Sequence, residues 1–496
     1  MFGNGNCRHA ANPRSRASKN SLAIVLIALA LRSVTASVSC ASDIPSTNLA
    51  AVNDVLTRQR SFPAMGHAGV LSPGGALLAY TVRSGVFASE NAARRYTASG
   101  MLPEYGTGTE LRVSNTRTGA LVQVSEGQGA VSDPVWSPDG SQLAFVSDRG
   151  GAAQVWLWSK QTLQVRRLAD AIVRPSFYEG ASLKWTPDGK YVIALALPKD
   201  MTLAQADARA QGNSRDATAQ MLAVMSADVA LLDALTGEVR RLARDKSVFW
   251  YAPAPDGKSV AYAYPSARAA GSGQWLFNVE VAGMDAGATR VVAESAYAND
   301  GAFAWSPDST RIAYFASGTR GRDGAHVIDI AAKADREATS ITFSTLEAND
   351  IHRRVYWTPD GASLLFILSG RLWRVTPQTG EASMVTPAEW NREIVQIVPR
   401  GRSSVVWTRD NGRSITVTTR DLTGEIMGFY RIDVAAGKVT KLREDEKRYG
   451  DYVKPALASD DGTFVFWAAE DAKTPMDLWG AGPNLKDALR LTQLNP

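Results

Sequence analysis

The residues that could perform covalent chemistry are few and widely spaced in this sequence. A serine hydrolase of the α/β type requires a Gly-x-Ser-x-Gly turn, followed by an acid and a histidine. The sequence holds no such pentapeptide, and Gly271-Ser272-Gly273 lacks its spacing and sits in a predicted loop. His326 and His352 lie beside predicted strands, which favours structural roles for both. We therefore assign no catalytic residue.

Metal and cofactor sites have no better support. The four histidines, at positions 9, 67, 326 and 352, form no cluster with the two cysteines, Cys7 and Cys40, so no zinc-site spacing is present. There is no glycine-rich phosphate loop before a helix and no H-E-x-x-H motif. Paired carboxylates such as Asp460-Asp461 fall in predicted turns. We expect no cofactor and no bound metal.

One sequence motif, which we call the repeat phrase, recurs along the chain. It indicates which strands and turns would position any functional site. In 135–148, an apolar strand ending at Trp136 is followed by Ser137-Pro138-Asp139-Gly140 and a second strand. Pro presets φ in a type I turn, Asp caps the turn, and Gly accepts the positive φ that follows. Clear copies begin at Trp185, Trp305 and Trp357, weaker ones at Leu71, Ala254 and Ala458, and a degraded one spans 397–401, before a strand-like 404–407.

The spacing of this phrase predicts the fold. A second hairpin follows most copies, with turns such as Thr118-Gly119 and Thr236-Gly237, so the repeat contains four short strands. Its length is about fifty residues, close to the roughly 40–50 of a propeller blade. The sequence therefore predicts an all-β fold, a β-propeller of seven or eight four-stranded blades over residues 69–496. Unrelated sandwich hairpins would not repeat Trp-(Ser/Thr)-Pro-Asp at similar intervals.

The amino-terminal region differs from the rest. Residues 1–40 combine a basic leader, the apolar run Ser21–Leu31 and small residues beyond it, the layout of a secretory signal peptide. The apolar run is too short for a permanent membrane span. Lipid attachment at Cys40 is not favoured, because Ser37 stands where an aliphatic residue would be expected. We expect a periplasmic or secreted protein, with a short helix at 48–60 inside a lead-in of residues 41–68.

The distribution of charge bears on the possible partners, and two insertions interrupt the repeat. Charged residues make up 21% of the 496-residue chain, and the net charge of +5 lies partly in the leader. No basic stripe with interleaved aromatic residues is present, which argues against nucleic acid as a partner. Two insertions interrupt the blades: Val86–Gly108, and the Ala-rich, helix-like Lys199–Met225. The charged run Glu444–Arg448 is expected to be a solvated loop.

The repeat and the order of parts resemble two families. The TolB-like periplasmic propellers, with their PD40 repeats, share the Trp-Ser-Pro-Asp-Gly…Phe-Val-Ser-Asp-Arg-Gly-Gly wording of residues 136–151. The prolyl oligopeptidase (S9) family, in its dipeptidyl and acylaminoacyl peptidase branches, places a helix before the first blade and an α/β-hydrolase domain after the last. Three features favour this second family: the helix at 48–60 leading into Leu71-Ser72-Pro73-Gly74, the eight candidate repeats, and the exit-like wording of 491–496.

The resemblance implies the substrate-gating propeller of an exported S9-type serine peptidase. The catalytic residues of that family would lie beyond Pro496, so none is carried over, and this chain is expected to be inert by itself. A peptide or protein ligand at the channel, and a separate hydrolase domain, are the implied partners. The long blade-one insertion favours the lasso-peptide isopeptidase branch, whereas the paired-Glu motif of dipeptidyl peptidases is not found. The alternative is a stand-alone TolB-like propeller that binds a protein or peptide; a propeller enzyme acting on glycans is a third hypothesis.

Overall fold

The computed structural model divides the chain into two compact units, Met1–Arg58 and Gln59–Pro496, and every residue described below belongs to the second. The predicted signal peptide and all of the predicted 48–60 helix except Arg60 lie outside the described residues. The structure describes residues 60–61, 69–84, 96–102, 109–125, 127–176, 180, 183–211, 217–268, 275–285, 289–296, 298–316, 324–337, 354–400, 404–405, 407, 413–448, 450, 456–471 and 476–494.

The first four blades follow one another along the chain. Blade 1 contains β1 (Arg60–Ser61), β2 (Val70–Leu71), β3 (Leu77–Ser84), β4 (Thr109–Asn115) and β5 (Leu121–Gln123). Blade 2 contains β6 (Val131–Trp136), β7 (Gln142–Ser147), β8 (Gln154–Ser159) and β9 (Val165–Arg167). Blade 3 contains β10 (Lys184–Trp185), β11 (Tyr191–Ala196), helices α3 (Leu203–Gln211) and α4 (Ala217–Met225), β12 (Ala227–Asp233) and β13 (Val239–Lys246). Blade 4 contains β14 (Trp250–Pro253), β15 (Ser259–Arg268), β16 (Trp275–Gly283) and β17 (Arg290–Ala296).

The remaining four blades complete the series. Blade 5 contains β18 (Ala298–Trp305), β19 (Arg311–Ala316), β20 (Gly324–Asp329) and β21 (Ala334–Glu337). Blade 6 contains β22 (Tyr356–Trp357), β23 (Leu364–Leu368), β24 (Arg371–Thr376) and β25 (Glu381–Met384). Blade 7 contains β26 (Arg392–Ile397), β29 (Ser414–Asp421), β30 (Ile426–Asp433) and β31 (Val439–Glu446), with a separate hairpin of β27 (Pro399–Arg400) and β28 (Ser404–Val405). Blade 8 contains β32 (Leu457–Ala458), β33 (Phe464–Ala468), β34 (Asp477–Ala481) and β35 (Leu489–Arg490).

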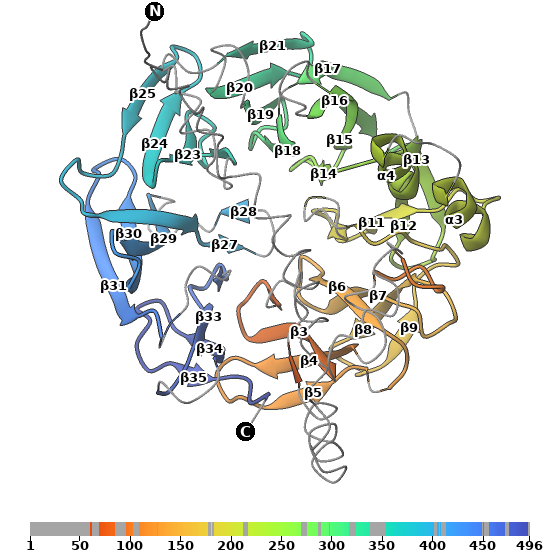
Figure 1. Cartoon of the computed structure of the whole chain (residues 1–496), viewed down its shortest axis with the longest axis horizontal. Helices are drawn as coiled ribbons and strands as arrows, with labels where there is room; N and C mark the ends of the chain where they lie inside the picture. Colours follow the sequence, from red (N-terminus) through yellow and green to blue (C-terminus); the bar gives the residue numbers. More distant parts are fainter. Residues whose placement is uncertain are drawn as a thin grey trace, which may run out of the picture. The chain divides into compact units, whose positions relative to one another are not determined.

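The predicted propeller is confirmed, and it has eight blades. In each blade the strands pair antiparallel in chain order, and in blade 1 both β1 and β2 pair with β3. Figure 1 shows the eight sheets arranged around a centre, with the first strand of a blade near the middle and its last strand at the rim. The first strand of each blade therefore leaves one edge directed toward the central channel.

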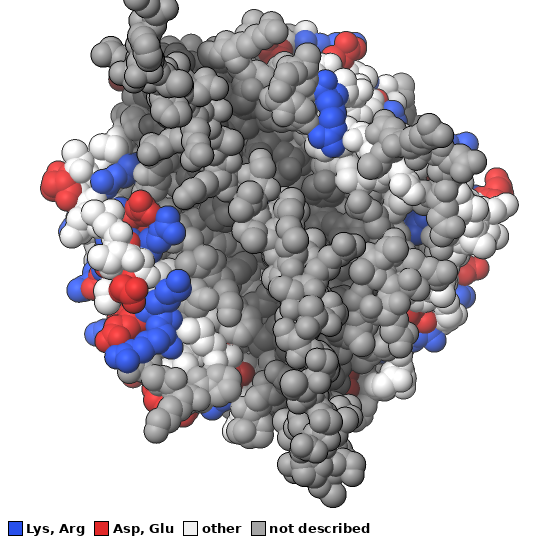
Figure 2. Space-filling model, viewed as in Figure 1, with Lys and Arg blue, Asp and Glu red and all other residues white. Residues whose placement is uncertain are grey.

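Three local predictions were wrong in blade 7. The degraded repeat at 397–401 does end an innermost strand, but Pro399–Arg400 enters a small hairpin instead of a tight turn. The second strand of the blade is Ser414–Asp421, not the strand-like 404–407. Glu444 was expected in a solvated loop, but it belongs to strand β31, which continues to Glu446, and it pairs with Arg392. Figure 2 shows mixed positive and negative charge on this rim, with no stripe of one sign.

The core consists of eight apolar clusters, one between each pair of neighbouring blades. Alternate residues of the second strand supply the two sides: Leu143 and Phe145 pack toward blade 1, and Ala144 and Val146 toward blade 3. Side chains alternate between faces along a strand, so an uninterrupted apolar run buries both faces of a blade. This geometry explains why a single blade could not be stable alone.

Tryptophan side chains join the inner strands of successive blades. The indole N–H of Trp136 donates to the backbone oxygen of Val70 in blade 1, at 3.1 Å. The repeat tryptophans of blades 3, 5 and 6 make the same bond, also at 3.1 Å, to the innermost strand of the blade before: Trp185 to Val135, Trp305 to Ala252, and Trp357 to Ala304. Each bond satisfies both a buried indole donor and a carbonyl on an otherwise unpaired strand edge.

Arginine side chains join the outer parts of the blades in the opposite direction. Arg240 of β13 donates to the backbone oxygen of Met284 in blade 4, at 2.7 Å, and Arg431 of β30 donates to that of Pro483 in blade 8, at 3.0 Å. Arg166 of β9 donates in the same way to Ala234 in blade 3. Four tryptophans thus bond to the preceding blade, and these arginines to the following one.

Packing of the two chain-terminal blades closes the ring. The buried carboxylate of Asp477 accepts hydrogen bonds from Arg490 at 2.5 Å and from the hydroxyl of Thr492 at 2.7 Å. This network holds the final segment in place, so that Leu491 and Leu494 pack against blade 1. Among the described strands, no sheet combines the two ends of the unit.

The Ser/Thr-Pro-Asp turns are rigid caps. Ser137 donates to the carboxylate of Asp139 at 2.5 Å and accepts a hydrogen bond from the backbone N–H of Gln142 at 2.9 Å. The same arrangement recurs at Thr186, Ser306 and Thr358. Hydrogen bonds from Ser137 and Ser306 lower the pKa of Asp139 and, to about 2, that of Asp308. Thr358 acts likewise and lowers the pKa of Asp360.

Replacing Trp305 by Phe should destabilise the propeller by about 1–2 kcal/mol, because it removes one bond between blades and leaves a buried acceptor unpaired. Denaturant unfolding measures the change. Trp390→Phe is the matched control, because Trp390 is also half-buried and its indole donates to no residue in the described part of the chain. Equal losses in the two variants would contradict the role of the hydrogen bond.

The capping carboxylates should make stability depend on pH in the acidic range. A carboxyl whose pKa is lower in the folded state stabilises the fold above its unfolded pKa of about 3.9, and this contribution disappears as pH falls toward the folded value. We expect D139N/D308N/D360N to be less stable than the natural chain at pH 7. The difference should shrink between pH 4 and pH 2, measured by urea midpoints. A difference independent of pH would show that the charge does not matter.

Candidate functional site

The two ends of the propeller differ in what they carry. Because strands alternate in direction, all Ser/Thr-Pro-Asp turns lie at one end, which we call the turn face. The other end, the insertion face, carries the links between second and third strands and the links from one blade to the next. Both insertions are therefore on the insertion face, as are β1 and Thr492, which follows β35.

The described parts of the insertions contact each other above blades 2 to 4. Ser99 of the first insertion donates to the carboxylate of Asp148 at 2.6 Å, in the link between β7 and β8. Gly100 has a φ of +88°, and a Cβ on it would lie 2.9 Å from a Leu203 methyl in α3. In α4, Val224 packs into the core cluster between blades 2 and 3, and Met225 into the cluster between blades 4 and 5. The predicted helical insertion is thus confirmed as two helices.

A short segment between blades 2 and 3 carries a buried cation toward the channel. Its backbone is fixed on both sides, because Val173 donates to Ala153 and Arg174 donates to Leu195, each at 2.8 Å. Arg174 is only 3% exposed, and its guanidinium lies 4.3 Å from the centre of the Tyr96 ring. The Tyr96 hydroxyl donates to the backbone oxygen of Pro175 at 3.0 Å. The first insertion thus holds the segment in place.

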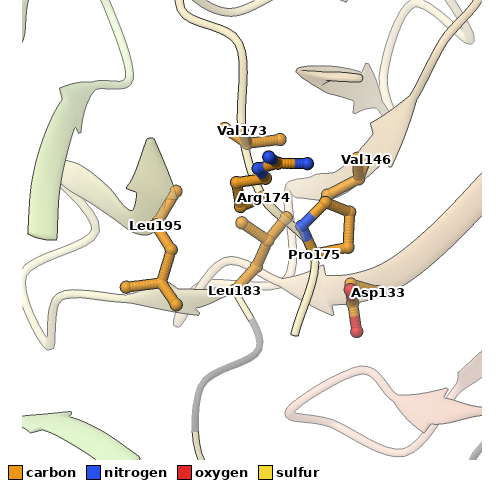
Figure 3. A pocket seen from close by; sticks show the side chains of 8 residues that line it. Asp133, Val146, Val173, Arg174, Pro175, Leu183 and Leu195 are labelled. Atoms are coloured by element: carbon orange, nitrogen blue, oxygen red, sulfur yellow. The ribbon is translucent and has the colours of Figure 1, made fainter. Parts of the chain in front are cut away.

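A small recess opens beside this segment, with an internal volume of about 10 Å³. Its walls are mainly apolar, from blades 2 and 3, and Arg174 and Asp133 are its two charged residues. Figure 3 shows the Arg174 and Asp133 side chains directed to different sides of Pro175. A recess of this size holds about one water molecule, so a ligand would contact it only with a small terminal group.

Asp133 has an unusual backbone conformation. It lies in β6 at a bulge between Ser132 and Val135, with a φ of +53°, a value that non-glycine residues adopt only at a cost. The next residue, Pro134, has no N–H to donate and is tolerated only at a strand edge. The inner edge of blade 2 is therefore bent at the recess, and such strain is common at functional sites.

The residues that the sequence analysis considered for catalysis or metal binding do not form a common site among the described residues. The side chain of His326 stacks on Tyr314 in blade 5, and its Nδ1 lies 3.4 Å from the carboxylate of Asp335. Asp461 accepts a hydrogen bond from Thr463 in a turn of blade 8. His9, His67, His352, Gly271-Ser272-Gly273 and both cysteines lie outside the described residues.

Two searches of the described residues gave negative results. No group of three or more His, Cys, Asp or Glu side chains in these ranges is placed to hold a metal ion. No helix among them has the length and apolar character needed to cross a bilayer.

Sequence analysis missed the recess. Arg174 and Asp133 precede or interrupt repeat phrases, where they carry no motif of their own. The available signal was Asp133-Pro134 inside an apolar strand, since Pro is unfavourable in a paired strand.

Comparisons with known proteins concern parts of this chain. No family model matches it. Over 82 residues the chain is 38% identical to an uncharacterized peptidase, YuxL, of Bacillus subtilis (strain 168); the match covers 16% of this chain and 12% of that protein.

Solved structures with a similar outline include peptidase propellers and a lyase. Acylaminoacyl peptidase of Pyrococcus horikoshii has a TM-score of 0.45 and 14% identity, over 84% of this chain and 51% of that one. The β-propeller domain of the Trilobed protease from Pyrococcus furiosus has a TM-score of 0.43 and 14% identity, over 88% and 98% of the two chains. An oligogalacturonate lyase in complex with manganese has a TM-score of 0.46 and 12% identity, over 76% and 93%. The propeller assignment above rests on strand pairing.

The strain at Asp133 can be tested with two substitutions that remove the same carboxylate. Because Gly adopts positive φ readily and Ala does not, Asp133→Ala should be less stable than Asp133→Gly by about 1 kcal/mol. At the neighbouring Ser132, whose φ is not positive, the order should be reversed, since Gly weakens a regular strand. Denaturant unfolding of the four variants measures both differences. The same order at both positions would exclude backbone strain at Asp133.

Proposed function

We propose that this chain is the substrate-gating propeller of an exported serine peptidase of the prolyl oligopeptidase kind. In this proposal the propeller admits and holds unstructured peptides, and an α/β-hydrolase domain cleaves them. The 82-residue similarity to a protein named as a peptidase is consistent with this class.

One observation carries the proposal: the channel mouth, both insertions and both ends of the propeller unit share the insertion face. A domain joined to either end would be tethered on this side. A peptide crossing the mouth would then meet the recess with Arg174 before it reached such a domain. The turn face instead offers the regularly capped Ser/Thr-Pro-Asp turns.

A different observation favours the second candidate, a stand-alone TolB-like propeller that binds a protein or peptide. A hydrolase docked near blade 8 would be expected to leave apolar surface there when absent. The described part of blade 8 shows no large exposed apolar side chain on the insertion face; Leu489 lies toward the turn face. The large apolar side chain exposed on the insertion face of the neighbouring blade 7 is Leu422, which is 71% exposed. One such side chain does not make the apolar surface that a docked domain would cover.

Peptide binding by the purified chain tests the proposal. Fluorescence anisotropy should detect binding of labelled, unstructured peptides, and Arg174→Gln should weaken it about tenfold, the usual cost of one hydrogen bond to a charged group. Arg174→Lys keeps the charge and controls for lost burial, and Arg448→Gln, at the exposed rim of blade 7, should have no effect. Equal binding by all variants would remove Arg174 from the site.

Activity and the coding DNA then separate the two candidates. We expect no turnover of aminoacyl or peptidyl esters by the purified chain. Turnover that resists serine-directed inhibitors would contradict the peptidase proposal. DNA beyond the codon for Pro496 that encodes Gly-x-Ser-x-Gly, then Asp and His, would support it, and a stop followed by unrelated sequence would favour the stand-alone binder.

A further inference from the structure

Besides the recess with Arg174, a second cluster of charged and aromatic side chains lies at the insertion face, outside the repeat phrases. It is centred on Trp250, the first residue of β14 and only 6% exposed. Three aromatic or cationic side chains surround its ring: the Nζ of Lys184 at 5.9 Å, the guanidinium of Arg354 at 5.1 Å, and the ring of Phe303 at 6.5 Å. These residues come from blades 3, 6 and 5, respectively.

The contact between Arg354 and Trp250 shows where this cluster lies. Arg354 precedes the innermost strand of blade 6, whereas Trp250 begins the innermost strand of blade 4. Blade 5 separates these blades, so Arg354 reaches Trp250 past the inner end of blade 5, where Phe303 also contacts the Trp250 ring. Both residues stand at the insertion-face end of their strands. The cluster therefore lines the channel mouth.

The ring of Trp250 is fixed, but its N–H is not used. Gly180 lies flat against the indole, since a Cβ there would fall 1.9 Å from a ring carbon. Lys184 donates to the backbone oxygen of Gly180 at 2.6 Å and lies 4.5 Å from the Tyr251 ring. In contrast to the four tryptophans that join blades, Trp250 donates to no acceptor within the described ranges.

We propose that Trp250, Lys184 and Arg354 form a binding site for the carboxylate of a peptide. An indole N–H and two cations at the edge of a partly desolvated channel are complementary to a negatively charged acceptor. The aromatic surfaces of Trp250 and Phe303 would contact an adjacent apolar side chain. This inference rests on the proposed function, because it names the peptide group that the gating propeller recognises.

The test compares one labelled peptide as the free acid and as the carboxy-terminal amide. The free acid should bind about tenfold more tightly, and less so at high salt, because a charge-assisted hydrogen bond contributes roughly 1.5–3 kcal/mol and exposed charges are screened. An amidated peptide with an internal Glu distinguishes a side-chain carboxylate from a terminal one. Either acidic form binding better than the neutral amide supports the site and identifies its source of charge.

The variants connect any such preference to these residues. Trp250→Phe removes the N–H and keeps the ring, and Arg354→Gln removes one charge; each should reduce the preference for the acid about three- to tenfold. Trp156→Phe and Arg149→Gln are matched controls, because Arg149 lies 5.2 Å from the Trp156 ring in blade 2, away from this cluster. Circular dichroism checks folding, and Arg354→Lys should keep much of the preference.

The outcomes separate this inference from the proposed function. The carboxylate site is overturned if the free acid and the amide bind with equal affinity. It is also overturned if the preference for the acid is unchanged in Trp250→Phe and Arg354→Gln. Either result leaves the gating role standing. N-acetylphenylalanine serves as a probe that is not a peptide substrate. If it binds in a manner that depends on Trp250 while no peptide binds, the site stands and the gating role fails. Binding of neither probe overturns both.

Discussion

The fold depends on burying both faces of sheets that cannot be stable alone. Each blade supplies one side of two apolar clusters, so the stability of one blade depends on the presence of its neighbours. The indole hydrogen bonds from Trp136, Trp185, Trp305 and Trp357 add direction to this packing, because each fixes an inner strand relative to the blade before it. Apolar contact alone is not directional; these bonds set the position of the inner edges.

The same constraint explains where chemistry can occur. A tryptophan that bonds to the preceding blade satisfies the edge near the turn face, where the repeat phrase ends. Toward the insertion face the inner edge of blade 2 is bent at Asp133, and the segment before blade 3 is a non-repeating link. Arg174, Lys184 and Trp250 all stand at this end. In the blades with a repeat tryptophan, the turn-face end of the inner strand therefore builds the ring, and the candidate site residues stand at the opposite end.

Much of the fold could be predicted from sequence, because the turn phrase acts locally. Ser137, Pro138, Asp139 and Gly140 each have a role within a few residues, so pattern and spacing suffice to locate a blade. Blade 7 escaped correct prediction because its tight turn is replaced by a small hairpin, and β29 then begins ten residues later than expected (414 against 404). The charged run at Glu444 was mistaken for a loop, since alternating ion pairs on a long outer strand resemble a solvated connection.

The candidate sites could not be predicted in the same way, because they depend on contacts between residues far apart in sequence. Tyr96 reaches Pro175 from the first insertion, and Arg354, which precedes blade 6, reaches Trp250 of blade 4. Neither pair has a characteristic spacing, and each residue alone resembles an ordinary core or surface residue. What distinguishes Trp250 is its N–H: the repeat tryptophans, which stand at a different position of the inner strand, use theirs to join blades, and Trp250 does not. In a repeat protein, a buried polar group that lies outside the repeat and forms none of its common bonds is thus a better pointer to function than the repeat itself.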